Sequence, residues 1–218
     1  MKTKPIINKA VIGLALAGLA IGAIFRGRNC NAAIIHPKAP DGGQQIVSKD
    51  LGAQSLKFLG VSRIEDLTIA DPFQNYSVWP TNLASGQLLF EAKPTSWRYL
   101  LMKGTNAVGS EDLGADEKTG KPLVFYSLEK GDRMLAAVRI AEQLPQTQKS
   151  DYELRYLEIA PVEFVAIWLH GQSDDIIIPL PPTFGRWKAY QPYSESQMAK
   201  LLKPEVEKKL KEPPGTVD

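Results

Sequence analysis

The residues whose types could support chemistry gather in one stretch, Phe164 to Pro182, with the sequence FVAIWLHGQSDDIIIPLPP. It contains His170, one of two histidines in the chain, four residues before Asp174 and Asp175. An imidazole beside carboxylates occurs in metal sites and in acid–base catalysis. The six residues before the histidine are apolar without alternation, and Ile176–Ile178 is β-branched, as in strands that are covered on both faces. We therefore predict a hairpin whose turn carries the histidine and the aspartates.

A metal ion at this turn would need at least one more ligand from elsewhere in the chain. The other histidine, His36, is followed by Pro37 and has neither an acidic residue nor a second histidine close to it in the sequence. The single cysteine, Cys30, excludes an intrachain disulfide and a cysteine-based metal site. We predict no metal site and no cofactor.

The acidic segment Gly109 to Lys121 comes nearest to a nucleotide-binding motif. Its sequence GADEKTGK has five residues between the glycines where a phosphate-binding loop has four, and Pro122 stands where that loop has serine or threonine. It also lacks the alternating ligands of a calcium loop. The acidic residues concerned are Glu111, Asp112, Asp116 and Glu117. We interpret the segment as a solvated loop.

The chain also lacks the GxSxG motif of a serine nucleophile, so an enzyme of this sequence would have to use carboxylates alone. Glu158 and Glu163, on either side of Pro161, are such a pair, although two solvated carboxylates at strand ends are the more ordinary interpretation. We predict that the protein is not an enzyme.

The first 28 residues predict a membrane signal. A basic start is followed by sixteen uncharged, almost wholly apolar residues from Ala10 to Phe25. Arg26 and Arg28 directly after this run favour an uncleaved anchor, whereas the small residues around Cys30 suit a cleaved signal peptide. A buried helix of a cytosolic protein is the third interpretation. The excess of basic residues before the run places the amino end in the cytoplasm and the remaining domain outside it.

Within this segment Gly18 and Gly22 form a GxxxG pair, which is typical of membrane helices that pack closely and suggests a homodimer. Six of the 26 basic residues and none of the 24 acidic ones lie in the first forty positions, which leaves a net charge of −4 for the rest. A mildly acidic domain argues against a nucleic-acid partner, because such partners are bound by basic surfaces.

The remaining pattern predicts an α+β domain: an antiparallel sheet of about five to six strands with a helix packed on one face. We divide the chain into a signal (1–28), a linker (29–45), a globular domain (46–203) and a charged, flexible tail (204–218). A helix is expected over 47–59, ended by Gly60, and another after a capping box at Ser194–Gln197, interrupted by Pro204. Strands are expected at 73–79, 88–91, 97–102, 123–128, 134–141 (with a helix as the alternative), 154–159, 164–169 and 176–180. Short connections without an intervening helix favour antiparallel pairing.

Aromatic and basic residues alternate after the last strand, in the segment TFGRWKAYQPY. Its candidate partner-binding residues are Phe184, Arg186, Trp187, Tyr190 and Tyr193. They predict either a strap whose aromatic rings cover the sheet or an exposed surface for a protein partner. The sequence therefore favours a membrane-anchored, extracytoplasmic, non-enzymatic interaction or structural module. A small-molecule or lipid-binding domain with a pocket between sheet and helix is the alternative, and a carboxylate-based hydrolase is the third hypothesis.

Overall fold

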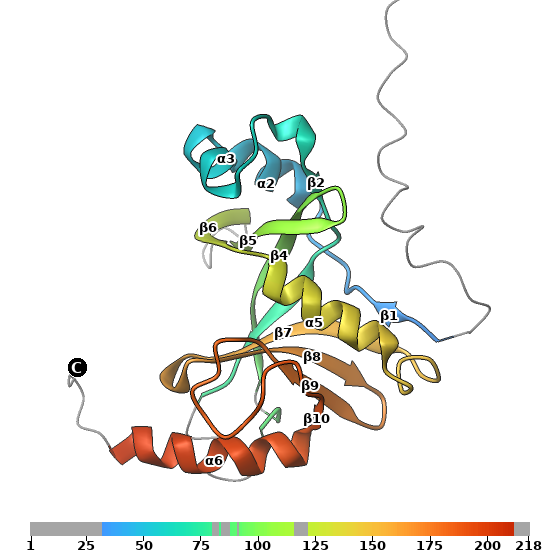
Figure 1. Ribbon diagram of the computed structural model, residues 1–218, viewed down its shortest axis with the longest axis vertical. Helices are drawn as coiled ribbons and strands as arrows, with labels where there is room; N and C mark the ends of the chain where they lie inside the picture. Colours follow the sequence, from blue (N-terminus) through green and yellow to red (C-terminus); the bar gives the residue numbers. More distant parts are fainter. Residues whose placement is uncertain (1–31, 80–82, 84–87, 91, 116–121, 212–218) are drawn as a thin grey trace, which may run out of the picture.

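A computed structural model describes residues 32–79, 83, 88–90, 92–115 and 122–211 (Figure 1). The helices are α2 (Gly43–Asp50), α3 (Ala53–Leu59), α5 (Asp132–Gln143) and α6 (Glu195–Lys211), with short 3₁₀ turns η1 (Ile64–Asp66) and η2 (Ala160–Val162). The strands are β1 (Ile34–Ile35), β2 (Thr68–Ile69), β3 (Phe73–Ser77), β4 (Lys93–Lys103), β5 (Asn106–Ala115), β6 (Pro122–Glu129), β7 (Tyr152–Ile159), β8 (Phe164–Gly171), β9 (Asp175–Pro179) and β10 (Tyr193–Ser194). The predicted α+β class is confirmed.

The described strands form one ten-stranded sheet in the order β10-β9-β8-β7-β3-β4-β5-β6, with β1 beside β7 and β2 beside β4. Two antiparallel meanders, β3–β6 and β7–β10, meet at their first strands, and β3 pairs with β7 in parallel. The sheet is therefore mixed and larger than the predicted antiparallel sheet of five to six strands.

Helix α5 explains the parallel pairing. The segment 134–141 is not a strand but the body of this helix, which connects β6 to β7 (Figure 1). Its buried residues, Met134, Ala137, Val138 and Ala141, follow the i, i+3, i+4, i+7 spacing of one helical face. A helix of this length carries the chain across the sheet, so β7 can start from the same end as β3.

Strand β5 corrects a second prediction. Residues 109–121 were expected to form a solvated loop, but β5 continues to Ala115, and Glu111 and Asp112 within it are only 5% and 7% exposed. Residues 116–121 of that segment lie outside the described residues. In contrast, residues 88–90, predicted as part of a strand, form bends and a turn. The strand was interpreted as a loop because its small and acidic residues are typical of loops.

Helices cover both faces of the sheet, not one. Side chains that alternate along β4, β7 and β8 assign α2, α3 and α6 to one face and α5 to the other. The predicted helix over 47–59 is two helices, because the chain is extended at Gly52. Gly60 ends α3 in the left-handed conformation, with φ of 66°, as predicted.

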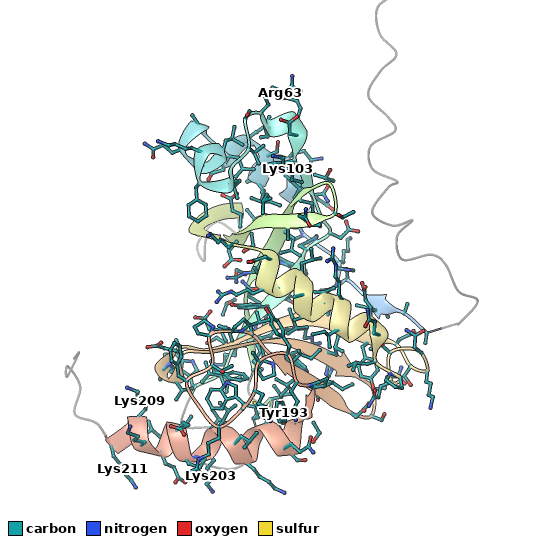
Figure 2. The ribbon with its side chains drawn as sticks, in the orientation of Figure 1. Arg63, Lys103, Tyr193, Lys203, Lys209 and Lys211 are labelled. Atoms are coloured by element: carbon teal, nitrogen blue, oxygen red, sulfur yellow. The ribbon has the colours of Figure 1, made fainter. Side chains whose placement is uncertain are left out.

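Helix α6 begins with the predicted capping box: the Gln197 amide donates to Ser194 Oγ, and the Ser194 amide donates to Gln197 Oε1. The helix then continues through Pro204 to Lys211, so residues 204–211 of the predicted tail are helical. Val206, beyond the proline, is fully buried against the sheet. Figure 2 shows the lysines of this helix at the opposite end of the molecule from Arg63, near η1.

The β8–β9 hairpin, predicted from its sequence, is confirmed, with His170 and Asp175 as cross-strand partners. Within the predicted linker, β1 pairs with β7. The apolar run from Ala10 to Phe25, with Gly18 and Gly22, lies outside the described residues. Among the described residues, no helix is both long and apolar enough to cross a membrane.

Candidate functional site

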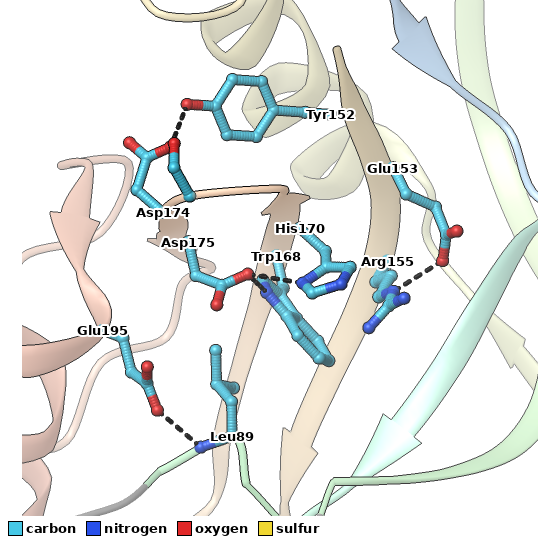
Figure 3. Close-up of polar contacts among 10 residues, drawn as sticks. Leu89, Tyr152, Glu153, Arg155, Trp168, His170, Asp174, Asp175 and Glu195 are labelled. Carbon is cyan, nitrogen blue, oxygen red and sulfur yellow. Dashed lines mark hydrogen bonds and ion pairs between the residues drawn. The ribbon is translucent and has the colours of Figure 1, made fainter. Parts of the chain in front are cut away.

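A cluster of polar and aromatic side chains lies where β7, β8 and β9 approach the hairpin turn, on the face that α6 also covers (Figure 3). The register aligns Glu153, His170 and Asp175 in one row across the three strands, and Arg155 with Trp168 in the next row. We call these five residues the sheet-face cluster. Consecutive strands about 4.8 Å apart bring these side chains into contact without any contribution from a loop.

Asp175 orients the histidine of this cluster. One of its carboxylate oxygens, Oδ1, accepts hydrogen bonds from Trp168 Nε1 at 2.7 Å and from His170 Nδ1 at 2.8 Å. Because an ionised carboxylate only accepts, His170 Nδ1 is the donor of this bond. The His170 side chain is 41% exposed to solvent.

Arg155 fixes the other side of the cluster. Its Nε donates to Glu153 Oε1 at 2.6 Å, and its guanidinium lies over the rings of Trp168 and Tyr76 at 4.5 and 4.6 Å. Burial raises the pKa of Tyr76, and the charge of Arg155 opposes that rise. Cation–π contacts and an ion pair therefore hold the guanidinium, whose side chain is only 14% exposed.

The remaining carboxylates near the hairpin have structural partners. Asp174 accepts a hydrogen bond of 2.7 Å from the Tyr152 hydroxyl, and burial followed by this bond raises the pKa of Tyr152 to about 12. Glu195 Oε1 accepts from the Leu89 amide. In the described part of the chain, no three His, Cys, Asp or Glu side chains are arranged to hold a metal ion. The contacts shown for the sheet-face cluster are hydrogen bonds, an ion pair and cation–π contacts among its own members and Tyr76.

A second polar feature, which sequence reasoning missed, lies on the opposite face under α5. Arg98 of β4 forms a two-pronged ion pair with Asp112 of β5, with both N–O distances at 2.6 Å and side chains 3% and 10% exposed. The guanidinium also lies 4.1 Å from the centre of the Tyr156 ring. The strand that carries Arg98 was expected over residues 97–102, whereas the strand that carries Asp112 was interpreted as a loop, so the ion pair could not be predicted from the sequence.

The predicted partner-binding residues are separated by the fold. Trp187 is 4% exposed and packs edge-on against Phe164 at 5.2 Å, whereas Phe184 is 65% exposed. Tyr190, with φ of 63°, donates its amide to the Pro179 carbonyl, and its side chain packs against the core under α5. Tyr193 packs in the α6 core and its hydroxyl accepts from the Lys188 amide. Arg186 is exposed. The segment is built as the predicted strap, which leaves Phe184 outside.

The connection between β3 and β4 carries two exposed aromatic residues that were not identified from the sequence. Trp79 is 65% exposed and Phe90 is 76% exposed, and they lie near the two ends of the connection between β3 and β4.

Beside the turn of the β8–β9 hairpin, a polar open depression of about 520 Å³ is lined by the segments Gln148–Asp151 and Gly171–Asp174. Ligand pockets for small apolar molecules are enclosed and apolar, and this depression is neither.

The carboxylates considered for hydrolysis, Glu158 and Glu163, are both exposed, at the end of β7 and after η2.

The chain matches no protein-family model, no curated protein and no solved structure.

Proposed function

We propose that the protein is a non-enzymatic interaction module, tethered at a membrane by its N-terminal segment, with the described domain outside the cytoplasm. The observation that carries the interaction role is the pair of exposed aromatic residues Trp79 and Phe90. Large aromatic side chains supply much of the binding energy in protein interfaces. When they are exposed to water, their apolar surface area contributes no hydrophobic stabilisation, and a partner that buried this area would gain it.

The fold brings these two residues to one end of the sheet. Ser77 and Lys93 are cross-strand partners in the β3–β4 pair. Trp79 follows Ser77 by two residues and Phe90 precedes Lys93 by three, so an extended chain puts each within about 10 Å of that strand end. Nearby Val78, Leu83 and Leu88 are buried against α6, which anchors the connection on the sheet. Both exposed aromatic residues therefore lie close in the sequence to residues that are buried against α6.

The alternative of a pocket between sheet and helix receives less support. Val47 of α2, Leu51 directly after that helix and Leu59 of α3 pack on the sheet residues Tyr99, Leu101 and Leu113. Carboxylate-based hydrolysis has no support from Glu158 and Glu163, which are solvent-exposed.

The test compares the full-length, detergent-extracted chain with a Trp79→Ala/Phe90→Ala variant. Phe58→Ala is the matched control, because Phe58 is an aromatic residue 53% exposed on α3, remote in the fold from the β3–β4 connection. We expect a co-purifying protein that the wild type and the control retain and the double variant loses, with unchanged thermal unfolding of all three. Identical co-purification with all three proteins would refute the assignment of the surface.

A further inference from the structure

Helices α2 and α3 cover a pair of buried polar groups on β4 and β5. Tyr99 and Glu111 are cross-strand partners on this face, and they are 0% and 5% exposed. The Tyr99 hydroxyl and Glu111 Oε2 have no hydrogen-bond partner in the described part of the chain. An unsatisfied buried polar group costs about 1–3 kcal/mol, so this helical layer closes over groups that favour water.

Helix α2 adds a second carboxyl group at the same place. Asp50, the last residue of α2, is close enough to Glu111 to raise the pKa of that carboxyl group. At the other end of α2, Gly43 lies so close to the Tyr99 hydroxyl that a Cβ atom there would overlap it. The helix therefore packs tightly over both polar groups.

Burial under this layer favours the neutral form of the Glu111 carboxyl group. Burial, the hydrogen bond to Asp50 and the charges of Asp50 and Asp112 raise its pKa to about 8 from an ordinary value of 4.5. Asp112 acts along the strand from the opposite face, and Tyr99 is the titratable neighbour on β4. The paired strand β6 carries Tyr126 and Glu129 in its sequence, and Lys49 precedes Asp50 on α2.

We propose that α2 and α3 form a pH-dependent flap over β4 and β5, closed while Glu111 is protonated and released when it ionises. Ionisation places a charge in the low-dielectric contact beside the Asp50 carboxylate, and opening the flap returns both charges to water. The pH dependence has one sign. An acid whose pKa is raised in the closed state stabilises that state at low pH, and the stabilisation falls as the pH rises through 4.5 towards 8.

The connections of this layer permit local opening. Gly42, before α2, and Gly60, after α3, both have left-handed backbone conformations, and Gly52 separates the two helices in an extended conformation. Outside its apolar contacts, the layer is held to the sheet by exposed hydrogen bonds such as Gln44 Nε2 to the Ile69 carbonyl and Lys103 Nζ to the Gly60 carbonyl. Exposed bonds of this kind are typical of segments that open below the global unfolding limit.

Amide hydrogen exchange of the full-length chain tests the proposal, with protection factors corrected for the intrinsic pH dependence of exchange. Amides of α2 and α3 are expected to be less protected than those of β7 and β8 at every pH. Their protection factors are expected to fall about tenfold per pH unit, or about 100-fold between pH 5.5 and 7.5, because each pH unit below the raised pKa changes the opening equilibrium tenfold.

Two substitutions separate this mechanism from general alkaline sensitivity. Glu111→Gln removes the ionisation and is expected to abolish the slope in α2 and α3. Asp50→Asn keeps the Glu111 carboxyl group but removes the Asp50 charge, so the pKa of Glu111 is expected to fall. The fall in protection with rising pH should then end at a lower pH than in the wild type. Glu142→Gln is the control, since burial also raises the pKa of this α5 carboxyl group, and it should leave the slope unchanged. Equal protection of the two sets of amides, a missing slope, or a slope that survives in Glu111→Gln would overturn the proposal.

Discussion

The ion pair between Arg98 and Asp112 offers a sharp test of how the centre of the sheet is stabilised. Each N–O distance is 2.6 Å, both side chains are at most 10% exposed, and Tyr156 covers the guanidinium. Removing one partner leaves the other charge buried without its counter-ion. Such changes cost about 3–5 kcal/mol, a large share of the 5–15 kcal/mol by which domains are stable.

We therefore expect Arg98→Met and Asp112→Leu each to lower the free energy of unfolding by about 3–5 kcal/mol. The double variant Arg98→Met/Asp112→Leu should cost less than either single change, because it buries no unpaired charge. Methionine at position 98 retains contact with the Tyr156 ring through its sulfur atom, and Met134 already lies 3.9 Å from the guanidinium.

Urea unfolding of the full-length chain, followed by tryptophan fluorescence, measures these differences as shifts in midpoint at constant slope. Arg63→Met is the control, since Arg63 lies at the tip of the helical layer, 68% exposed beside Glu65 and Asp66 (Figure 2). Its exposed pairs should contribute within about 0.5 kcal/mol. If the double variant lost the sum of the two single losses, the ion pair would not be the stabilising unit and the reasoning would be refuted.

Three further predictions concern stability. Gly171→Ala should destabilise by about 1–3 kcal/mol in thermal or urea unfolding, because its Cβ would lie 2.6 Å from the Asp174 carbonyl oxygen, whereas Gly52→Ala, with open space around it, should not. Ser194→Ala removes half of the α6 capping box and should cost about 1 kcal/mol, with loss of helical circular dichroism on mild heating. Glu111→Gln should raise the free energy of unfolding by about 3 kcal/mol at pH 7 and leave it unchanged at pH 4. The reason is that the Glu111 pKa is about 8 in the folded chain against an ordinary value of 4.5, which costs the wild type about 1.4 kcal/mol for each pH unit above 4.5. An equal effect at both pH values would contradict this.

Local sequence signals predicted the elements whose pattern is set within a few residues. The β8–β9 hairpin follows from two apolar runs around a polar turn, and the start of α6 follows from the Ser194–Gln197 box. Gly171 is required at the turn, but for space beside Tyr152 rather than for a left-handed backbone. Short-range geometry of this kind is encoded locally, so the sequence alone is sufficient.

The topology depended on one ambiguous segment. Met134–Ile140 contains alanine, valine and leucine in an order that fits either period, and its interpretation as a strand removed the helix between β6 and β7. Without that helix a parallel pairing of β3 and β7 has no connection, so an antiparallel sheet followed. The buried residues of this segment recur at i, i+3, i+4 and i+7, which fits the helical period of 3.6 residues and not the period of two that a strand requires.

The exposed aromatic residues could not be identified from the sequence because exposure is a tertiary property. Trp187 and Phe184 are three residues apart in one aromatic segment, yet Phe164 of a distant strand covers the first and leaves the second in solvent. Trp79 and Phe90 have no recurring spacing in the sequence. Only the pairing of Ser77 with Lys93 brings them to the same strand end.

Strand β5 joins the two polar features that the sequence interpretation placed in a loop. Its consecutive residues Glu111 and Asp112 face opposite sides of the sheet, one under α2 and the other paired with Arg98 under α5. The charge of Asp112 is among the causes that raise the pKa of Glu111. The ionisation that governs the contact with α2 is therefore coupled through one strand to a carboxylate beneath α5, and a neutral residue at position 112 removes one of the interactions that hold the Glu111 proton in place.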